Sequence, residues 1–189
     1  MHGISVLTEP QHFNGSFDDL AAAVAETTKP VLCKDFIVTP GQLELASRLG
    51  AGSVLIIVKL KPSLALVGKC LDLCLEPLLE IHDEQDLNAI VPVVRGNPGL
   101  FIVGINNRDL ATLRVNTSTT VKLAPLAREL LGDEPVIISE SGIESPADAK
   151  RLYMAGVDGF LIGTAFMNTP VDALEATIGR YIDIFKGGD

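Results

Sequence analysis

Short runs of apolar residues alternate with amphipathic stretches along the whole chain. The runs are continuous rather than alternating, which is typical of parallel strands buried on both faces. They predict strands at Ile4–Leu7, Pro30–Lys34, Ser53–Val58, Pro77–His82, Phe101–Asn106, Pro135–Glu140 and Gly159–Gly163. The amphipathic stretches predict helices at about Ser16–Glu26, Pro40–Leu49, Pro62–Leu73, Glu84–Val91, Thr117–Leu130, Pro146–Ala155 and Val171–Phe185. This alternation favours right-handed βαβ crossovers within one parallel sheet.

Proline and glycine residues mark the expected helix ends. Four dipeptides place a proline in the first helical turn, three of them behind a hydroxyl side chain that can cap the helix: Thr39-Pro40, Lys61-Pro62, Ser145-Pro146 and Thr169-Pro170. Gly50 and Gly156 are expected to end two helices and to lead into the next strand.

Several apolar runs stop on a polar residue. Four of these residues are Lys34, Glu80, Asn106 and Glu140, and a fifth run stops on Gly163-Thr164. Barrel enzymes take their catalytic groups from the C-terminal ends of several parallel strands. The pattern therefore predicts an α/β fold of the TIM (β/α)8 type with an active site at the strand ends.

The number of strands is one short of a complete barrel. A TIM barrel has eight strands and about 250 residues, whereas seven strands are predicted in these 189 residues. The first βα unit is the one we expect to be absent. A seven-stranded sheet has open edges that invite pairing, so we expect either a truncated chain or a gap covered by another copy or segment.

Composition is consistent with one soluble domain spanning residues 1–189. The chain is 47% hydrophobic and its mean hydropathy is +0.34, but no apolar stretch approaches the roughly 18 to 20 residues that span a bilayer. A net charge of −9 disfavours binding to nucleic acid and to anionic membranes. An anionic ligand would therefore have to be held by local groups.

The three cysteines, Cys33, Cys70 and Cys74, have neither a paired spacing nor histidines at metal-ligand distance. We therefore expect no metal site and no disulfide framework, in a reduced cytoplasmic setting. Cys33 is expected to pack in the core, and Cys70 and Cys74 to share one helix face.

Six motifs, in order, resemble the indole-3-glycerol phosphate synthase family of tryptophan biosynthesis. They are Ile4-Ser5-Val6-Leu7-Thr8-Glu9, Phe13-Asn14-Gly15-Ser16, Lys34-Asp35-Phe36-Ile37, Glu80-Ile81-His82-Asp83, Gly104-Ile105-Asn106-Asn107-Arg108-Asp109-Leu110 and Ser139-Glu140-Ser141-Gly142-Ile143. The resemblance implies a barrel carboxy-lyase without a cofactor. Its reaction closes the ring of 1-(2-carboxyphenylamino)-1-deoxyribulose 5-phosphate, with loss of carbon dioxide and water, to give indole-3-glycerol phosphate.

The residue types suit this chemistry. Ring closure needs an acid or cation at the substrate's C2 oxygen, and Lys34 is the candidate. Glu80 matches the family's general base, Asn106 is expected to fix substrate hydroxyls or the carboxylate, and Glu140 is expected to orient Lys34 or a substrate hydroxyl. From the residues alone, Lys34 could instead be a strand-end lysine that reaches solvent, and each glutamate could be a structural ion-pair partner.

The phosphate is expected at the loops after the last two strands, where barrels often bind it beside a short extra helix. Ser141, Gly142, Gly163 and Thr164 would offer backbone N–H groups that small residues leave accessible. Without a ligand, the same residues would be two tight βα turns.

Three further residues are expected to contact the rest of the substrate. Phe13 and Phe36 are candidate walls for the aromatic ring, although either could be core, and Arg108 could add charge near the carboxylate or pair with Asp109. His82 is expected to be a helix-cap or loop histidine rather than a catalyst. Asp83, Glu84 and Asp86 are expected to form a solvated, acidic helix start.

The chain also departs from the family. The glutamate and lysine of the family's first strand have no counterpart, and the segment Pro92 to Leu100 is longer than the family's usual turn, which predicts a surface loop insertion.

Three interpretations of the function remain open. The chain is a synthase whose missing segment is supplied elsewhere, for example by a fused tryptophan-pathway partner, or has been lost. Alternatively, it is an inactive barrel that binds phosphate compounds or self-assembles, or it is a related enzyme such as phosphoribosylanthranilate isomerase. Lys34-Asp35-Phe36 and Asn106-Asn107-Arg108 argue against the isomerase, which is expected to use a cysteine and an aspartate.

Overall fold

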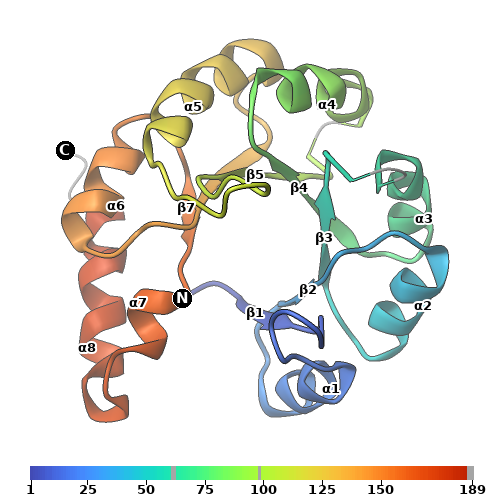
Figure 1. Ribbon diagram of the computed structural model, residues 1–189, viewed down its shortest axis with the longest axis horizontal. Coiled ribbons are helices and arrows are strands. Elements are labelled where there is room, and N and C mark those ends of the chain that lie inside the picture. The colour runs from blue at the N-terminus through green and yellow to red at the C-terminus, as the bar shows by residue number, and fades with distance from the viewer. Residues whose placement is uncertain (61–62, 98, 187–189) are drawn as a thin grey trace. The chain divides into compact units, whose positions relative to one another are not determined.

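The computed structural model describes residues 1–60, 63–97 and 99–186 (Figure 1). The chain forms two compact units. The first comprises His2–Ile81 with Leu100–Ile102, and the second comprises Met1, His82–Gly99 and Val103–Asp189.

The first unit holds four parallel strands in sequence order. They are β1 (Ile4–Leu7), β2 (Val31–Lys34), β3 (Ser53–Ile57) and β4 (Glu76–Ile81). The helices of this unit are α1 (Phe17–Glu26), α2 (Pro40–Arg48) and α3 (Val67–Asp72), and a 3-10 turn, η1 (Ser63–Leu66), directly precedes α3. In Figure 1, α1 lies against β1 and β2, and α3 lies against β4. All five residues of β3 are buried, which explains why this strand reads as an uninterrupted apolar run.

The second unit continues the same alternation. Its elements are α4 (Glu84–Gly96), β5 (Ile102–Asn106), α5 (Ser118–Leu131), β6 (Val136–Glu140), α6 (Pro146–Tyr153), β7 (Gly159–Leu161), α7 (Thr164–Met167), α8 (Val171–Ile182) and a 3-10 turn η2 (Asp183–Phe185). Here β5, β6 and β7 also follow in sequence order, and β6 pairs with β7 in parallel. The ring of Phe185 lies 5.1 Å from Tyr153 and 5.3 Å from Phe160, so η2 is held against α6 and β7.

The predicted fold class is confirmed. In the described residues, seven strands run in sequence order and each is followed by helix, which is the element order of a TIM-type barrel with seven of its eight βα units. The expected strands lie within two residues of the observed ones at each end. In the same residues no helix is both long and apolar enough to cross a membrane.

The helix boundaries confirm some of the end signals. Thr39 and Ser145 are the N-caps of α2 and α6, with proline directly after each, and Gly50 adopts a φ of 87° just beyond α2. The signal at Thr169-Pro170 is displaced by one residue, because the N-cap of α8 is Pro170 rather than Thr169. The expected start at Lys61-Pro62 lies outside the described residues.

Two of the expected helix features were wrong. The loop expected from Pro92 to Leu100 is helical as far as Gly96, since α4 runs on through Pro92. A proline removes only one helical N–H bond, and the buried side chains of Leu87, Ile90 and Val94 hold this helix against the core.

Cys70 and Cys74 do not share a helix face. Cys70 is buried in α3, whereas Cys74 follows the helix end with a φ of 56° and is exposed.

Candidate active site

Lys34 and Glu80 come together at the strand ends of the first unit. Lys34 is the last residue of β2 and Glu80 lies near the end of β4, with β3 hydrogen-bonded between the two strands. The Lys34 Nζ lies 3.4 Å from the Glu80 Oε2, and the two side chains are 21% and 2% exposed. A cation beside a buried carboxylate can donate a proton to one atom of a substrate while the carboxylate accepts another.

The residue after Lys34 ties the end of β2 to the end of β1. The Thr8 hydroxyl donates to Asp35 Oδ2 at 2.8 Å, and the Phe36 backbone N–H donates to Asp35 Oδ1 at 2.7 Å. Thr8 N–H also donates to the Lys34 carbonyl at 3.1 Å. These bonds hold the backbone of Lys34 and Asp35 at the end of β2 in place. Thr8 occurs in a motif of the sequence, but nothing in the sequence links it to Asp35.

The loop after β1 is organised by the Glu9 carboxylate. It accepts hydrogen bonds from the backbone N–H groups of Gln11, His12 and Phe13. Burial alone would raise the pKa of Glu9, but these bonds, first among them the one from His12, outweigh it and hold the pKa below its ordinary value of 4.5. The loop therefore keeps a charged carboxylate at neutral pH.

The two candidate aromatic walls lie on this loop and on the one after β2. The Phe13 ring is centred 6.1 Å from the Phe36 ring, and the His12 ring meets Phe36 edge-on at 6.3 Å. Phe13 is 51% exposed, so it is not a core residue and its ring is accessible to a ligand.

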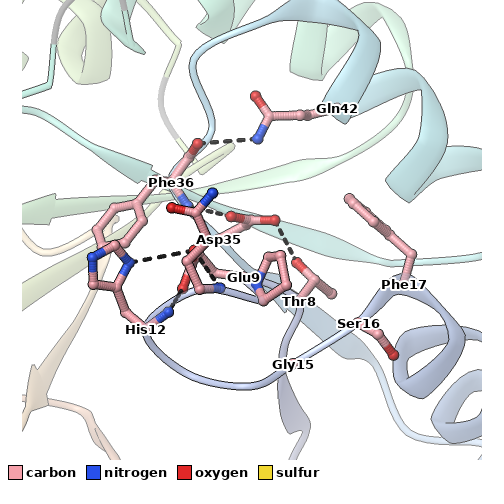
Figure 2. Close-up of a pocket in the computed structure, with 11 residues that line it drawn as sticks. Thr8, Glu9, His12, Gly15, Ser16, Phe17, Asp35, Phe36 and Gln42 are labelled. Atoms are coloured by element: carbon pink, nitrogen blue, oxygen red, sulfur yellow. Dashed lines mark hydrogen bonds and ion pairs between the residues drawn. The ribbon is translucent and has the colours of Figure 1, made fainter.

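A cavity of about 590 Å³ opens beside these loops (Figure 2). Its lining includes Glu9, His12, Phe36 and Gln42, and the Gln42 side chain donates to the Phe36 carbonyl at 3.0 Å. Lys34 and Glu80 are not among the described residues that line it. The cavity is therefore a neighbour of the Lys34–Glu80 pair and does not contain it.

In the second unit, Asn106 ends β5 and begins a turn. Its Oδ1 accepts from the Arg108 N–H at 2.9 Å, which leaves its Nδ2 group as the donor available to a ligand. The Arg108 guanidinium donates to the Leu113 carbonyl at 3.1 Å and is exposed. The Arg108 side chain therefore contacts the loop that follows β5.

Glu140 ends β6 and is followed by a tight turn. Glu140 is buried, and Ser141 and Gly142 both adopt left-handed backbone with φ of 65° and 73°. A Cβ on Gly142 would overlap the Val115 side chain. Only glycine fits this position because both its φ and its neighbours exclude a side chain.

Gly163 and Thr164 stand where a short helix begins. Gly163 is the N-cap of α7 and its carbonyl accepts from Phe166 N–H and Met167 N–H. The register pairs Glu140 with Leu161, so the Ser141–Gly142 turn and Gly163 follow neighbouring strand ends. A short helix after the last strand was expected beside a phosphate site, and α7 has that place in the chain.

The comparisons decide the family. The family model described as indole-3-glycerol phosphate synthase matches residues 1–177. This chain belongs to the indole-3-glycerol phosphate synthase family. It is 43% identical over 170 residues to the indole-3-glycerol phosphate synthase of Bacillus mycoides strain KBAB4 and 42% identical over 173 residues to that of Bacillus cereus strain G9842. Each match covers 88% of this chain and 64% of the relative, so the chain spans about two thirds of the length of these curated relatives.

The synthase-family motifs fall on both units. The first unit brings together Lys34 with Glu80 and Phe13 with Phe36. The second unit holds the remaining candidates, which are Asn106, Arg108, Glu140, Ser141, Gly142, Gly163 and Thr164. Their assignment to catalysis, substrate binding and phosphate binding stays a prediction.

Sequence reasoning missed Asn107 as a functional candidate of this synthase-family chain. Asn107 is 2% exposed, and its side chain bonds Ser139 and Thr120 as well as the carbonyls of Glu140 and Ser141. An asparagine next to a candidate active-site residue was the available signal, but only the fold shows what it contacts.

The acidic start of α4 also differs from its expected form. Asp83 caps the helix by accepting from Gln85 N–H and Asp86 N–H. The expectation of a solvated acidic helix start was wrong for Asp86, which is buried and accepts from the His82 N–H at 2.8 Å. The His82 Nδ1 lies 3.6 Å from the same carboxylate oxygen. His82 directly precedes the helix cap Asp83, and its non-catalytic role stays a prediction.

Proposed function

We propose that this chain carries the indole-3-glycerol phosphate synthase reaction. The substrate is 1-(2-carboxyphenylamino)-1-deoxyribulose 5-phosphate and the products are indole-3-glycerol phosphate, carbon dioxide and water. The observation that carries the proposal is the pairing of Lys34 with a buried Glu80, with 3.4 Å between Nζ and Oε2. Membership of the synthase family supports it.

The first bond to form joins the ring carbon that bears the carboxylate to C2 of the sugar. The electrons of the C2 carbonyl move onto its oxygen, and Lys34 donates a hydrogen bond or a proton to that oxygen. The carboxylate then leaves as carbon dioxide, and its bonding electrons restore the aromatic ring. An ammonium beside the buried Glu80 stays charged because the carboxylate pairs with it.

Dehydration completes the pyrrole ring. After Lys34 has taken up a new proton from solvent, the C2 hydroxyl leaves as water with that proton, while a carboxylate takes the proton that must depart from the neighbouring carbon. Glu80 is the proposed base. Asn106 can orient a substrate oxygen through its Nδ2 group because its Oδ1 is occupied by the Arg108 N–H.

The phosphate is proposed to bind at Ser141, Gly142, Gly163 and Thr164. Their backbone N–H groups supply donors without side-chain charge, which suits a chain with a net charge of −9. Phe13 and Phe36 are proposed to contact the aromatic ring, which fits the exposed face of Phe13.

The test is a fluorescence assay for indole-3-glycerol phosphate. The chain is assayed alone and again with a peptide that spans the family's first βα unit, because the match covers 64% of the relative and catalytic groups that act as a unit are not additive. Turnover in either arm, lost in Lys34→Ala, supports the proposal. A folded chain that turns over no substrate in either arm, yet binds inorganic phosphate, would replace it with a phosphate-binding barrel.

A further inference from the structure

The end of β5 is joined to the end of β6 by one buried amide. The Asn107 Nδ2 group lies 3.0 Å from each of three acceptors, which are the Ser139 hydroxyl and the carbonyls of Glu140 and Ser141. The Asn107 backbone N–H also donates to the Glu140 carbonyl at 2.9 Å. A single residue directly after β5 therefore holds the backbone on both sides of Ser141.

The opposite end of the same side chain bonds α5. Its Oδ1 accepts from the Thr120 N–H at 3.1 Å and from the Thr120 hydroxyl at 2.9 Å. The Thr120 and Ser139 hydroxyls lie 2.7 Å apart. The amide can sit only one way round, because a reversed Asn107 would put its oxygen against two carbonyls and its NH2 group against a backbone N–H.

The turn that Asn107 holds is strained. Ser141 is one of four non-glycine residues with positive φ in the part of the chain that the structure describes, and Gly142 follows it in the same region. A left-handed conformation is unfavourable for a residue with a Cβ and persists only where its surroundings enforce it. The bonds from Asn107 Nδ2 to the carbonyls of Glu140 and Ser141 span this residue, and the Val115 side chain packs against Gly142.

We propose that Asn107 is a positioning residue that keeps the Ser141–Gly142 turn left-handed, so that the turn's N–H groups and the adjacent Glu140 are placed for substrate. This rests on the proposed function, in which the turn binds the phosphate. Asn107 itself is buried and acts through the turn. Its loss should therefore weaken substrate binding more than it changes the fold.

The test compares two variants of the same network. Asn107→Ala removes the bonds to the Glu140 and Ser141 carbonyls. Thr120→Val removes a hydroxyl but keeps the shape of the side chain, the Thr120 N–H bond and all three Nδ2 bonds. Asn107→Ala should raise KM about tenfold or more and Thr120→Val less than about twofold, since a displacement of about 1 Å at a site can cost about 100-fold.

A second substitution separates positioning from general stability. Glycine adopts left-handed backbone without a Cβ penalty, so the KM penalty of Asn107→Ala should shrink when it is measured in the Ser141→Gly background. A full penalty in that background would overturn the proposal, as would equal KM changes in Asn107→Ala and Thr120→Val. If Asn107→Ala does not fold, Asn107→Asp takes its place, because its side chain has the same length and can still accept from the Thr120 N–H but has lost the NH2 group.

The proposal can fail separately from the proposed function. NMR amide shifts and the backbone coupling constant of Ser141 report the turn without any turnover. We expect them to change in Asn107→Ala and to stay as in wild type in Thr120→Val. If the wild-type chain has no activity, the proposed reaction fails while this comparison still decides whether Asn107 holds the turn. Unchanged Ser141 and Gly142 signals in Asn107→Ala would refute it.

Discussion

Replacing Lys34 by methionine removes the ammonium and keeps most of the side chain's length. In the proposed reaction Lys34 supplies both a proton and a charge at the C2 oxygen. A positioned acid contributes about 10² to 10⁴ in rate, so we expect a loss of at least about 10³-fold in kcat, or about 4 kcal/mol of transition-state stabilisation. The fluorescence assay for indole-3-glycerol phosphate measures it, in the arm where the wild-type chain is active.

The same change should cost stability because Glu80 is 2% exposed. At the 3.4 Å separation, the gross Coulomb attraction is about 5 kcal/mol with an effective dielectric constant of about 20. Desolvation offsets part of it, and Lys34 is one-fifth exposed, so we expect a net loss of about 1 to 3 kcal/mol in the free energy of unfolding. Urea denaturation of Lys34→Met, Glu80→Gln and the double variant gives the coupling between the two side chains.

A surface pair provides the matched control. The Lys69 Nζ lies 3.0 Å from the Glu44 Oε1, closer than in the Lys34–Glu80 pair, but both side chains are more than one-third exposed. Exposed pairs often contribute nothing measurable, so Lys69→Met should leave turnover and stability near wild type. The assignment of Lys34 is refuted if Lys34→Met keeps turnover within about tenfold of wild type, since a proton donor contributes more than that.

Three further outcomes follow from the structure. A Cβ on Gly163 or on Gly179 would meet no atom within 4 Å, so both alanine variants should fold, but only Gly163→Ala should weaken inorganic phosphate binding by isothermal titration calorimetry. Because the pKa of Glu9 is lowered in the folded state, its carboxylate stabilises the fold above about pH 4.5, and this stabilisation is lost as the pH falls through the lowered pKa. The difference in the free energy of unfolding between wild type and Glu9→Gln, measured in urea, should therefore close on acidification. Burial raises the pKa of Cys70 to about 11, while Cys74 is exposed, so a thiol reagent should label Cys74 alone in the native state and all three cysteines in denaturant.

The strands could be predicted because each obeys a local rule. Parallel strands buried on both faces must be apolar throughout, and their C-terminal ends are where polar residues can reach a ligand. Lys34 and Glu80 were assigned to strand ends for that reason, and the structure brings them within 3.4 Å. The register of the strands, rather than any feature of the two residues, sets this distance.

The errors arose where tertiary contacts override local preference. Pro92 predicted a loop, yet the buried face of α4 carries the helix through it. Asp86 read as a solvated carboxylate because acidic residues favour helix starts, but it is buried and accepts from the His82 N–H. Neither outcome follows from composition, because each depends on which neighbour packs against the residue.

The Asn107 network explains why adjacent polar residues in one motif have different roles. Asn106 is the last residue of β5 and Asn107 is the first residue after it, and the two adjacent asparagines have different hydrogen-bond partners. The Asn106 Oδ1 accepts from the Arg108 N–H in a turn and its Nδ2 group is proposed to bind substrate, whereas every polar atom of the Asn107 side chain is bonded within the protein. In the proposed function this motif therefore combines a residue that contacts substrate, Asn106, with one that holds the backbone after the next strand, Asn107, and only the contacts of single atoms distinguish the two.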